Sequence, residues 1–189
     1  MSSGRFSFSP IGEFAGLCLV QRTAIEDERG YLSRFFCAEE FAKAGVSMPV
    51  VQINHTLTRK KGAVRGMHFQ HIPHAEKKLV SCIKGEVWDV AVDLRQNSPT
   101  FLHWHGEVLS AANRKSLLIP EGFAHGFQTL TEDCELIYLH TEAYHQASED
   151  ALNALDPALS INWPLDIVEL SDRDRKHMFI EQNFQGIIL

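Results

Sequence analysis

The sequence predicts an all-β protein, built as an antiparallel β-sandwich or jelly-roll barrel with a few short helices. Three observations support this fold class. Short segments rich in β-branched and aromatic residues recur along the chain, and turn signals such as KKG at 60–62 and NSPT at 97–100 separate them. No helical segment lies between consecutive strands, whereas a parallel α/β sheet needs a crossover helix at each step. The pattern is therefore typical of an antiparallel sandwich or barrel.

Strands are expected through the middle of the chain. The segments are 51–57, 63–69, 78–83, 86–94, 116–120, 125–130 and 134–141. Val90 and Val92 alternate with Asp89 and Asp93, which predicts that the two sets of side chains lie on opposite faces of their strand. Helices are expected at 38–45, at 148–155 and near 171–179. Since no repeat, low-complexity tract or linker interrupts the chain, we expect a single domain over residues 1–189.

The composition is that of a globular protein whose core needs no disulfide or metal. The chain has 189 residues, of which 44% are hydrophobic and 22% are charged. Lys and Arg number 18 and Asp and Glu number 24, so the formal net charge is −6. A mildly acidic chain without a basic run argues against nucleic acid as a partner. A local group of Arg and Lys side chains can still bind a small anionic substrate.

Targeting and membrane signals are not visible in the sequence. The first residues contain no basic segment followed by an apolar stretch, so we expect no signal peptide. No apolar run approaches the roughly 18 residues of a membrane span. The cysteines Cys18, Cys37, Cys82 and Cys134 lie far apart and form no CxxC pair. We therefore expect reduced thiols in a cytoplasmic protein with no membrane partner.

Ten histidines raise the question of a bound metal. His68 and His71 are three residues apart, so on one strand they point to opposite faces. His103 and His105 have a spacing of two but follow a turn, and we expect them to be exposed residues of an edge strand. These spacings favour no metal ligand set, and we expect no bound metal.

His68 is a better candidate for a catalytic base. The ordinary pKa of imidazole, near neutrality, suits removal of a proton from a carbon next to a carbonyl group. Such a base needs a carboxylate to orient it, an acid across the substrate and a cation for the enolate oxygen. Asp89 or Asp174 could be the carboxylate, Tyr138 the acid, and Lys78 or Arg65 the cation. A structural histidine is the alternative reading of His68, since spacing alone does not bring these residues together.

The chain resembles the dTDP-4-dehydrorhamnose 3,5-epimerase family of nucleotide-sugar epimerases. The matching segments, in this order, are DERG (27–30), RGMHFQ (65–70), DVAVDLR (89–95) and IPEGFAHGF (119–127). The resemblance runs from about residue 10 to about residue 180. It implies a cupin-type jelly roll that works without a metal or other cofactor. It also implies a homodimer in which N-terminal strands pair with the partner's sheet.

The resemblance further implies roles for individual residues. His68 falls on the catalytic base, Asp174 on the carboxylate that pairs with it, and Tyr138 on the proton donor. Lys78 falls on the lysine near the keto oxygen of the sugar, and Tyr144 on the aromatic residue that stacks on the nucleotide base. The other substrate-contacting positions are Arg29, Gln52, Asn54, Arg65, His125 and Glu149, together with Asp89 as a carboxylate lining the same pocket. Arginine suits a diphosphate because its donors fork onto two oxygens.

Arg65 conflicts with strict strand alternation, which places it on the face opposite His68. The strand must bulge or end between them, and Gly66 is the position where a bulge is expected. Otherwise Arg65 would act from the rim of the pocket.

Several recognition positions depart from the family pattern. The chain has Leu32 where the family has a second aromatic residue and Arg34 where it has an acidic one. Glu76 replaces a glutamine, Arg173 replaces a lysine, and Ala143 replaces the first of two aromatic residues. We include Arg34 and Arg173 among the expected substrate contacts. The departures predict retained proton chemistry with altered recognition, including a weaker preference for thymidine and room for a CDP-sugar. The alternative is that Arg34 turns outward to solvent and leaves nucleotide choice unchanged.

The expected function is epimerisation of a nucleotide-linked 4-keto-6-deoxyhexose at C3, C5 or both, in deoxysugar biosynthesis. The substrate expected first is dTDP-4-dehydro-6-deoxyglucose. A ketoisomerase of the same fold remains an alternative, as do a non-catalytic sugar-binding cupin and a metal-dependent oxygenase.

Overall fold

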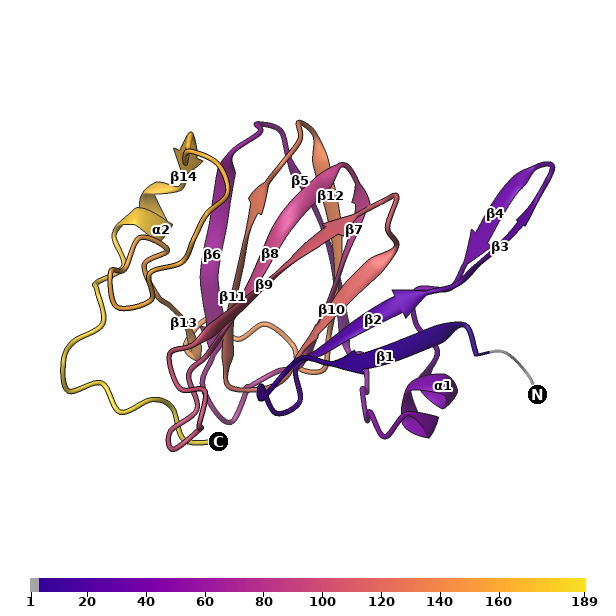
Figure 1. Ribbon diagram of the computed structural model, residues 1–189. Helices are drawn as coiled ribbons and strands as arrows, with labels where there is room; N and C mark the ends of the chain where they lie inside the picture. The colour runs from indigo at the N-terminus through magenta and orange to yellow at the C-terminus, as the bar shows by residue number, and fades with distance from the viewer. Residues whose placement is uncertain (1–3) are drawn as a thin grey trace.

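Two six-stranded, mainly antiparallel sheets pack against each other in the computed structural model, which describes residues 4–189 (Figure 1). The first sheet has the order β1 (Phe6–Pro10), β2 (Cys18–Arg22), β10 (Lys115–Ile119), β7 (Lys78–Lys84), β12 (Cys134–His140) and β5 (Gln52–Thr58). The second has the order β13 (Glu149–Ala151), β6 (Ala63–Gln70), β11 (Phe123–Thr129), β8 (Glu86–Asp93) and β9 (Trp104–Ser110), and β14 (Glu169–Leu170) pairs in parallel with β6. The all-β fold and the expected strands are confirmed.

The second sheet is covered on both faces, and the alternation in β8 shows why. Ala91 points inward and belongs to the core cluster between the sheets, together with Phe127 of β11. Val90 and Val92 point outward and pack with Leu152 and other residues of the C-terminal part of the chain. That segment runs along the outer side of β6, in yellow in Figure 1. The side chains of β8 therefore point to opposite faces, as predicted, and each face packs against apolar residues of another part of the chain.

The two helices are short. In α1 (Ala38–Lys43), Phe41 is fully buried and its ring packs edge-on against Phe6 and Phe8 of β1. In α2 (Asp172–Arg175), the Ser171 side chain caps the first turn by accepting a hydrogen bond from the Asp174 backbone N–H at 3.0 Å. Among the described residues, no helix is long and apolar enough to span a membrane.

The helix expected at 148–155 is wrong, because β13 and a buried loop occupy this segment. The edge of β6 offers unpaired backbone groups, and Leu152 exchanges two hydrogen bonds with Met67, at 2.9 and 3.2 Å. Pairing with the sheet also buries Ala151 and Leu152. Tertiary contacts therefore outweigh the local helix preference of this segment.

A hairpin of β3 (Ala24–Asp27) and β4 (Gly30–Ser33) projects away from the sandwich (Figure 1). It exposes large apolar side chains, with Tyr31 60% and Leu32 71% exposed. Strand β2 pairs with β10 of the same chain, and β1 pairs with β2 at the edge of the first sheet. Because β1 is the edge strand of this sheet, the expected pairing of N-terminal strands with a partner's sheet stays a prediction.

Candidate active site

A cavity of about 590 Å³ opens between the two sheets. One wall comes from β5, β7 and β12 of the first sheet, the other from β6 and β11 of the second, and residues around α2 close one side. The cavity brings together most of the predicted site residues: Gln52, Asn54, Arg65, His68, Lys78, His125, Tyr138, Tyr144, Glu149, Arg173 and Asp174. The sandwich thus gathers side chains from segments more than 100 residues apart.

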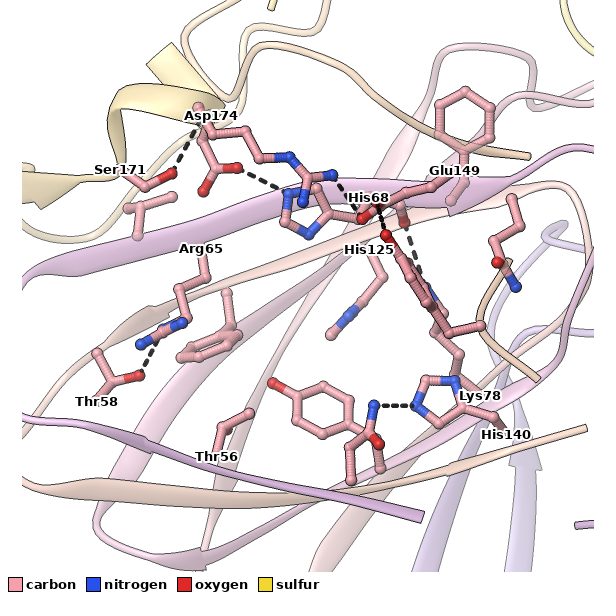
Figure 2. Close-up of a pocket in the computed structure, with 18 of the residues that line it drawn as sticks. Thr56, Thr58, Arg65, His68, Lys78, His125, His140, Glu149, Ser171 and Asp174 are labelled. Carbon is pink, nitrogen blue, oxygen red and sulfur yellow. Dashed lines mark hydrogen bonds and ion pairs between the residues drawn. The ribbon is translucent and has the colours of Figure 1, made fainter. Parts of the chain in front are cut away.

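His68 and Asp174 form a hydrogen-bonded pair at the second-sheet wall (Figure 2). The Nε2 atom of His68 lies 2.8 Å from Oδ1 of Asp174, which is buried in the first turn of α2. Burial by itself favours the neutral acid, but the hydrogen bond and charge of His68 outweigh it and hold the pKa of Asp174 below its ordinary value. The carboxylate therefore fixes the orientation of the imidazole, as the sequence predicts for a base.

A bulge at Gly66 places Arg65 and His68 in the same cavity, as the sequence predicts. His125 pairs with His68 and Phe127 pairs with Arg65, so a single residue of β11 faces two residues of β6. Gly66 has a φ of +131°, and a Cβ there would lie 2.5 Å from a backbone carbon of β11. Arg65 donates from Nε to Thr58 Oγ1 at 2.9 Å across the cavity (Figure 2).

Tyr138 and Lys78 line the opposite wall. Tyr138 lies on β12, and its ring centroid is 5.9 Å from that of His125 on the other sheet. Burial raises the pKa of the Tyr138 phenol, which keeps the hydroxyl protonated near neutral pH. The Lys78 Nζ atom is 3.1 Å from Glu76 Oε1, and its side chain is 10% exposed. A proton donor and a cation therefore face the His68 wall.

Glu76 and His140 were not predicted as site residues, yet both line the cavity. Glu76 Oε2 lies 2.8 Å from His140 Nδ1, and both side chains are nearly buried. Burial alone would raise the pKa of Glu76, but the hydrogen bond with His140 and the charge of Lys78 lower it below its ordinary value. The only feature of the sequence that pointed to this pair is that Glu76 stands where the family pattern has a glutamine.

Asp89 is not on the cavity wall, which corrects the sequence expectation. It is fully buried and lies 2.8 Å from Nε2 of His125. The sheet order explains this pairing, because β11 lies between β8 and β6. Two strand spacings, about 10 Å, separate β8 from β6, which is too far for Asp89 to orient His68. The two candidate carboxylates thus serve different histidines.

The outer end of the cavity holds a second polar group. The Tyr144 hydroxyl donates to Glu149 Oε2 at 2.8 Å, and Arg173 Nη2 lies 2.6 Å from Glu149 Oε1. The Tyr144 side chain is 54% exposed, so its ring is accessible to a ligand. Burial favours the neutral form of Glu149, but the hydrogen bonds from Arg173 and Tyr144 hold its pKa below the ordinary value.

Arg29 and Arg34 lie away from this chain's cavity. Arg29 is at the tip of the projecting hairpin, where it is exposed and pairs with Asp27 at 2.6 Å. Arg34 follows β4 and pairs with Glu40 of α1. The structure of the single chain therefore does not bring these two predicted contacts to the site.

His177 lies beside the His68–Asp174 pair and forms a cluster with it. The ligand atoms of His68, Asp174 and His177 all lie within 4.8 Å of one another, a donor set that a transition metal can use. His177 was not predicted as a site residue. His103 is exposed as expected, but His105 is half-buried beside Glu107, and burial lowers its pKa. The expectation of an exposed edge residue is thus wrong for His105.

The fold is of the jelly-roll type, and its cavity brings histidine, tyrosine, lysine and carboxylate side chains together. The model of the family described as dTDP-4-dehydrorhamnose 3,5-epimerase matches residues 12–182. The chain belongs to this family and is an epimerase.

Named relatives and solved structures agree with this assignment. The chain is 44% identical over 158 residues to a dTDP-4-dehydrorhamnose 3,5-epimerase from Salmonella typhimurium, covering 82% of this chain and 86% of that one. It is 36% identical over 157 residues to a dTDP-4-dehydrorhamnose 3-epimerase from Streptomyces niveus, covering 82% and 75%. A crystal structure of dTDP-6-deoxy-D-glucose-3,5-epimerase from Legionella pneumophila, in complex with dTDP-4-keto-L-rhamnose, superposes with a TM-score of 0.89 at 35% identity, covering 97% and 99%.

Proposed function

We propose that this enzyme inverts both C3 and C5 of dTDP-4-dehydro-6-deoxyglucose in deoxysugar biosynthesis. The observation that carries the proposal is the placement of the His68–Asp174 pair and Tyr138 on opposite walls of one cavity. Inversion needs a base on one face of the sugar ring and an acid on the other. The 3,5-epimerase relative is more similar to the chain than the 3-epimerase relative is, which supports inversion at both carbons.

The chemistry follows from the C4 keto group, which acidifies the hydrogens on C3 and C5. His68 removes one of these protons, and the electron pair of the C–H bond moves into the enolate, whose oxygen Lys78 stabilises with its positive charge. The Tyr138 hydroxyl then delivers a proton to the same carbon from the opposite face. Solvent water then takes the proton from His68 and returns one to Tyr138, so the second carbon can react in the same way and no other reactant is consumed.

The outer end of the cavity is proposed to hold the nucleotide. Arg65 and Arg173 bind the diphosphate, since a guanidinium donates to two phosphate oxygens at once. Tyr144 stacks on the base, and its exposed ring is available for this contact. Gln52, Asn54, His125 and Glu149 complete the contacts, and Asp89 acts by orienting His125.

We also propose a homodimer in the cytoplasm. The strand β5 is at the edge of the first sheet, and Ile53 on it is 64% exposed, while the projecting hairpin exposes Tyr31 and Leu32. Apolar groups of this size favour contact with a second copy. The hairpin would then bring Arg29 and Arg34 to the partner's cavity. The unpaired thiols of the four cysteines are consistent with a reducing compartment.

The deciding experiment incubates the enzyme with dTDP-, CDP- and GDP-linked 4-keto-6-deoxy sugars in deuterated water. We expect deuterium at both C3 and C5 of the dTDP-sugar, with inverted configuration at each carbon. Deuterium at C3 alone would show a 3-epimerase, and a carbonyl moved to C3 would show a ketoisomerase. No exchange with any sugar would indicate a binding protein, and loss of exchange after metal chelation would indicate a metal-dependent enzyme.

A further inference from the structure

A continuous series of polar contacts follows the first-sheet wall of the cavity, and its buried end is at Lys78. The Lys78 ammonium donates to Oε1 of Glu76, whose other carboxylate oxygen is 2.8 Å from His140 Nδ1. The side chains of Glu76 and His140 are 7% and 10% exposed. Little solvent is therefore available to either side chain, and each must satisfy its polar atoms within the protein.

The series continues toward the nucleotide end through β5. His140 Nε2 is 3.4 Å from Asn54 Nδ2, and Asn54 Oδ1 accepts from Gln52 Nε2 at 3.2 Å. Gln52 Oε1 accepts from the Tyr144 backbone N–H at 2.9 Å. Gln52 and Asn54 both line the cavity, so a bound substrate removes water from them. The series thus joins Lys78, proposed to contact the keto oxygen of the sugar, to Tyr144, proposed to stack on the nucleotide base.

The direction of these hydrogen bonds is set at the two ends. An ammonium group and a backbone N–H only donate. Each amide between them donates with nitrogen and accepts with oxygen, and a neutral imidazole donates with one nitrogen and accepts with the other. A series with a donor at each end therefore needs one member that accepts on both sides. Glu76 is that member, because an ionised carboxylate carries two acceptor oxygens and no donor.

A single protonation state of His140 fits this arrangement. Nδ1 carries the proton and donates to Glu76, while Nε2 accepts from Asn54. A proton on Nε2 would point at the amide nitrogen of Asn54, so two donors would face each other. Rotating the Asn54 amide by half a turn would remove that clash, but Gln52 would then have to rotate too, and its amide nitrogen would face the Tyr144 backbone N–H, which is also a donor. A glutamine at position 76 accepts on one side only, so it leaves one contact with two donors and no acceptor.

We propose that Glu76 and His140 are positioning residues, which fix the hydrogen-bond direction along this wall and thereby orient Lys78, Asn54 and Gln52 toward the substrate. The inference rests on the proposed function for what these groups contact. Neither residue touches the reacting carbons in this proposal. Their effect reaches the substrate through the Lys78 ammonium and through the two amides.

The first test is nitrogen NMR of the histidine side chains in the whole enzyme without substrate. The His140 signals are identified by their loss in His140→Gln. We expect a neutral ring with its proton on Nδ1, since Glu76 accepts there and Asn54 donates to Nε2. A protonated ring, or a proton on Nε2, overturns the proposal. This readout does not depend on any activity.

The second test moves the carboxylate that accepts on both sides from position 76 to the neighbouring position in the series, 140. Glu76→Gln and His140→Glu alone each break the direction of the series, and we expect each to lower kcat/KM about tenfold or more. Glu76→Gln combined with His140→Glu restores it with the same net charge, because the carboxylate introduced at position 140 accepts both from the amide introduced at position 76 and from Asn54. We expect the double variant to recover most of the lost kcat/KM, which a merely structural role does not predict.

Asp150→Asn provides the matched control. Asp150 pairs with His71 at 3.1 Å, but both side chains are about half exposed and neither lines the cavity. We expect kcat/KM to change less than about twofold, since an exposed pair contributes little. A double variant no better than its parents contradicts the inference while the proposed function stands. A wild-type enzyme that epimerises none of the sugars overturns the proposed function, and the NMR result still decides the protonation of His140.

Discussion

Oδ1 of Asp174 lies 2.8 Å from Nε2 of His68, and this contact joins two residues separated by 106 positions in the sequence. His68 is on β6, while Asp174 is in the first turn of α2 and is held there by the Ser171 cap. The carboxylate oxygen is therefore fixed by backbone structure, and the imidazole ring takes its orientation from it. The pair has the geometry of an imidazole base with a carboxylate that orients it.

His68→Ala should abolish deuterium exchange at C3 and C5 and leave nucleotide binding largely intact, because it removes the base and little of the ligand contact. Asp174→Asn should lower the rate less, by about two orders of magnitude, since it perturbs the orientation of a base that remains present. Both are measured by proton NMR of the sugar in deuterated water, with dTDP affinity as the control. Turnover near the wild-type rate in His68→Ala would contradict the proposed mechanism.

Tyr138→Phe should separate proton removal from inversion. The ring is kept and the acidic hydroxyl is lost, so His68 can still remove a proton while its return from the opposite face fails. Burial raises the pKa of Tyr138, which keeps the donor loaded at neutral pH in the wild type. We expect deuterium exchange with retained configuration in the variant. Inversion at the wild-type rate would assign the donor role to another group.

Glu76 should give the protein a pH-dependent stability. Its pKa in the folded protein is lowered, so its contribution is present above the ordinary carboxyl pKa of about 4.3 and is lost as the pH falls through the folded value. The difference in unfolding free energy between the wild type and Glu76→Gln should therefore be largest near pH 7 and shrink below about pH 4. Urea denaturation at a series of pH values measures it. Asp150→Asn, in an exposed pair, should show little such trend.

Gly66→Ala should destabilise the fold and disrupt the bulge in β6 that places Arg65 and His68 in the same cavity. A Cβ at this position meets the Gly126 Cα at 2.5 Å, and the φ of +131° is unfavourable for alanine. We expect a loss of about 2 kcal/mol or more in unfolding free energy. Gly30→Ala is the matched control, since Gly30 has a φ of +128° with nothing within 4 Å of an added Cβ. Equal losses in the two variants would show that the close approach to β11 contributes nothing.

Much of the fold could be predicted because strand alternation and turn residues are local properties. The sequence pattern does not predict the strand β9, and the reason is a side chain of the adjacent strand β8. Gly106 in β9 has no side chain because the Trp88 ring of β8 occupies the place where a Cβ would stand. A glycine with histidines around it does not resemble a strand, and the ring that explains it belongs to a different segment.

The sequence predicts that His68, Tyr138 and Lys78 share one site, and in the structure all three line the same cavity. The partners of these residues depend on the order of the strands. The residue types alone leave both Asp89 and Asp174 open as the carboxylate for His68, and the position of β11 between β6 and β8 excludes Asp89. His140 and Glu76 come from different segments, and no local pattern indicates that their side chains meet. Contacts of this kind follow from the sheet register, which single-sequence patterns do not fix.

The last prediction concerns nucleotide choice and Arg34. The sequence predicts a weaker preference for thymidine, because a guanidinium replaces the family's acidic residue and cannot accept a hydrogen bond from a base N–H. In the structure, Arg34 is paired with Glu40, whose carboxylate also accepts from the Arg5 backbone N–H at 2.7 Å. A guanidinium engaged in this way has less to offer a base, so we now expect dTDP to compete best.

Competition by dTDP, CDP, UDP and GDP against the wild type and Arg34→Glu measures this preference. We expect dTDP to bind most tightly to both proteins and the order of the other nucleotides to stay the same, since Glu40 engages the Arg34 guanidinium even where the dimer brings it to a partner's cavity. Arg34→Gln controls for repulsion between two carboxylates beside α1. If CDP binds best to the wild type and dTDP best to Arg34→Glu, Arg34 reads the base, and the hairpin that carries it must reach the cavity of a partner subunit.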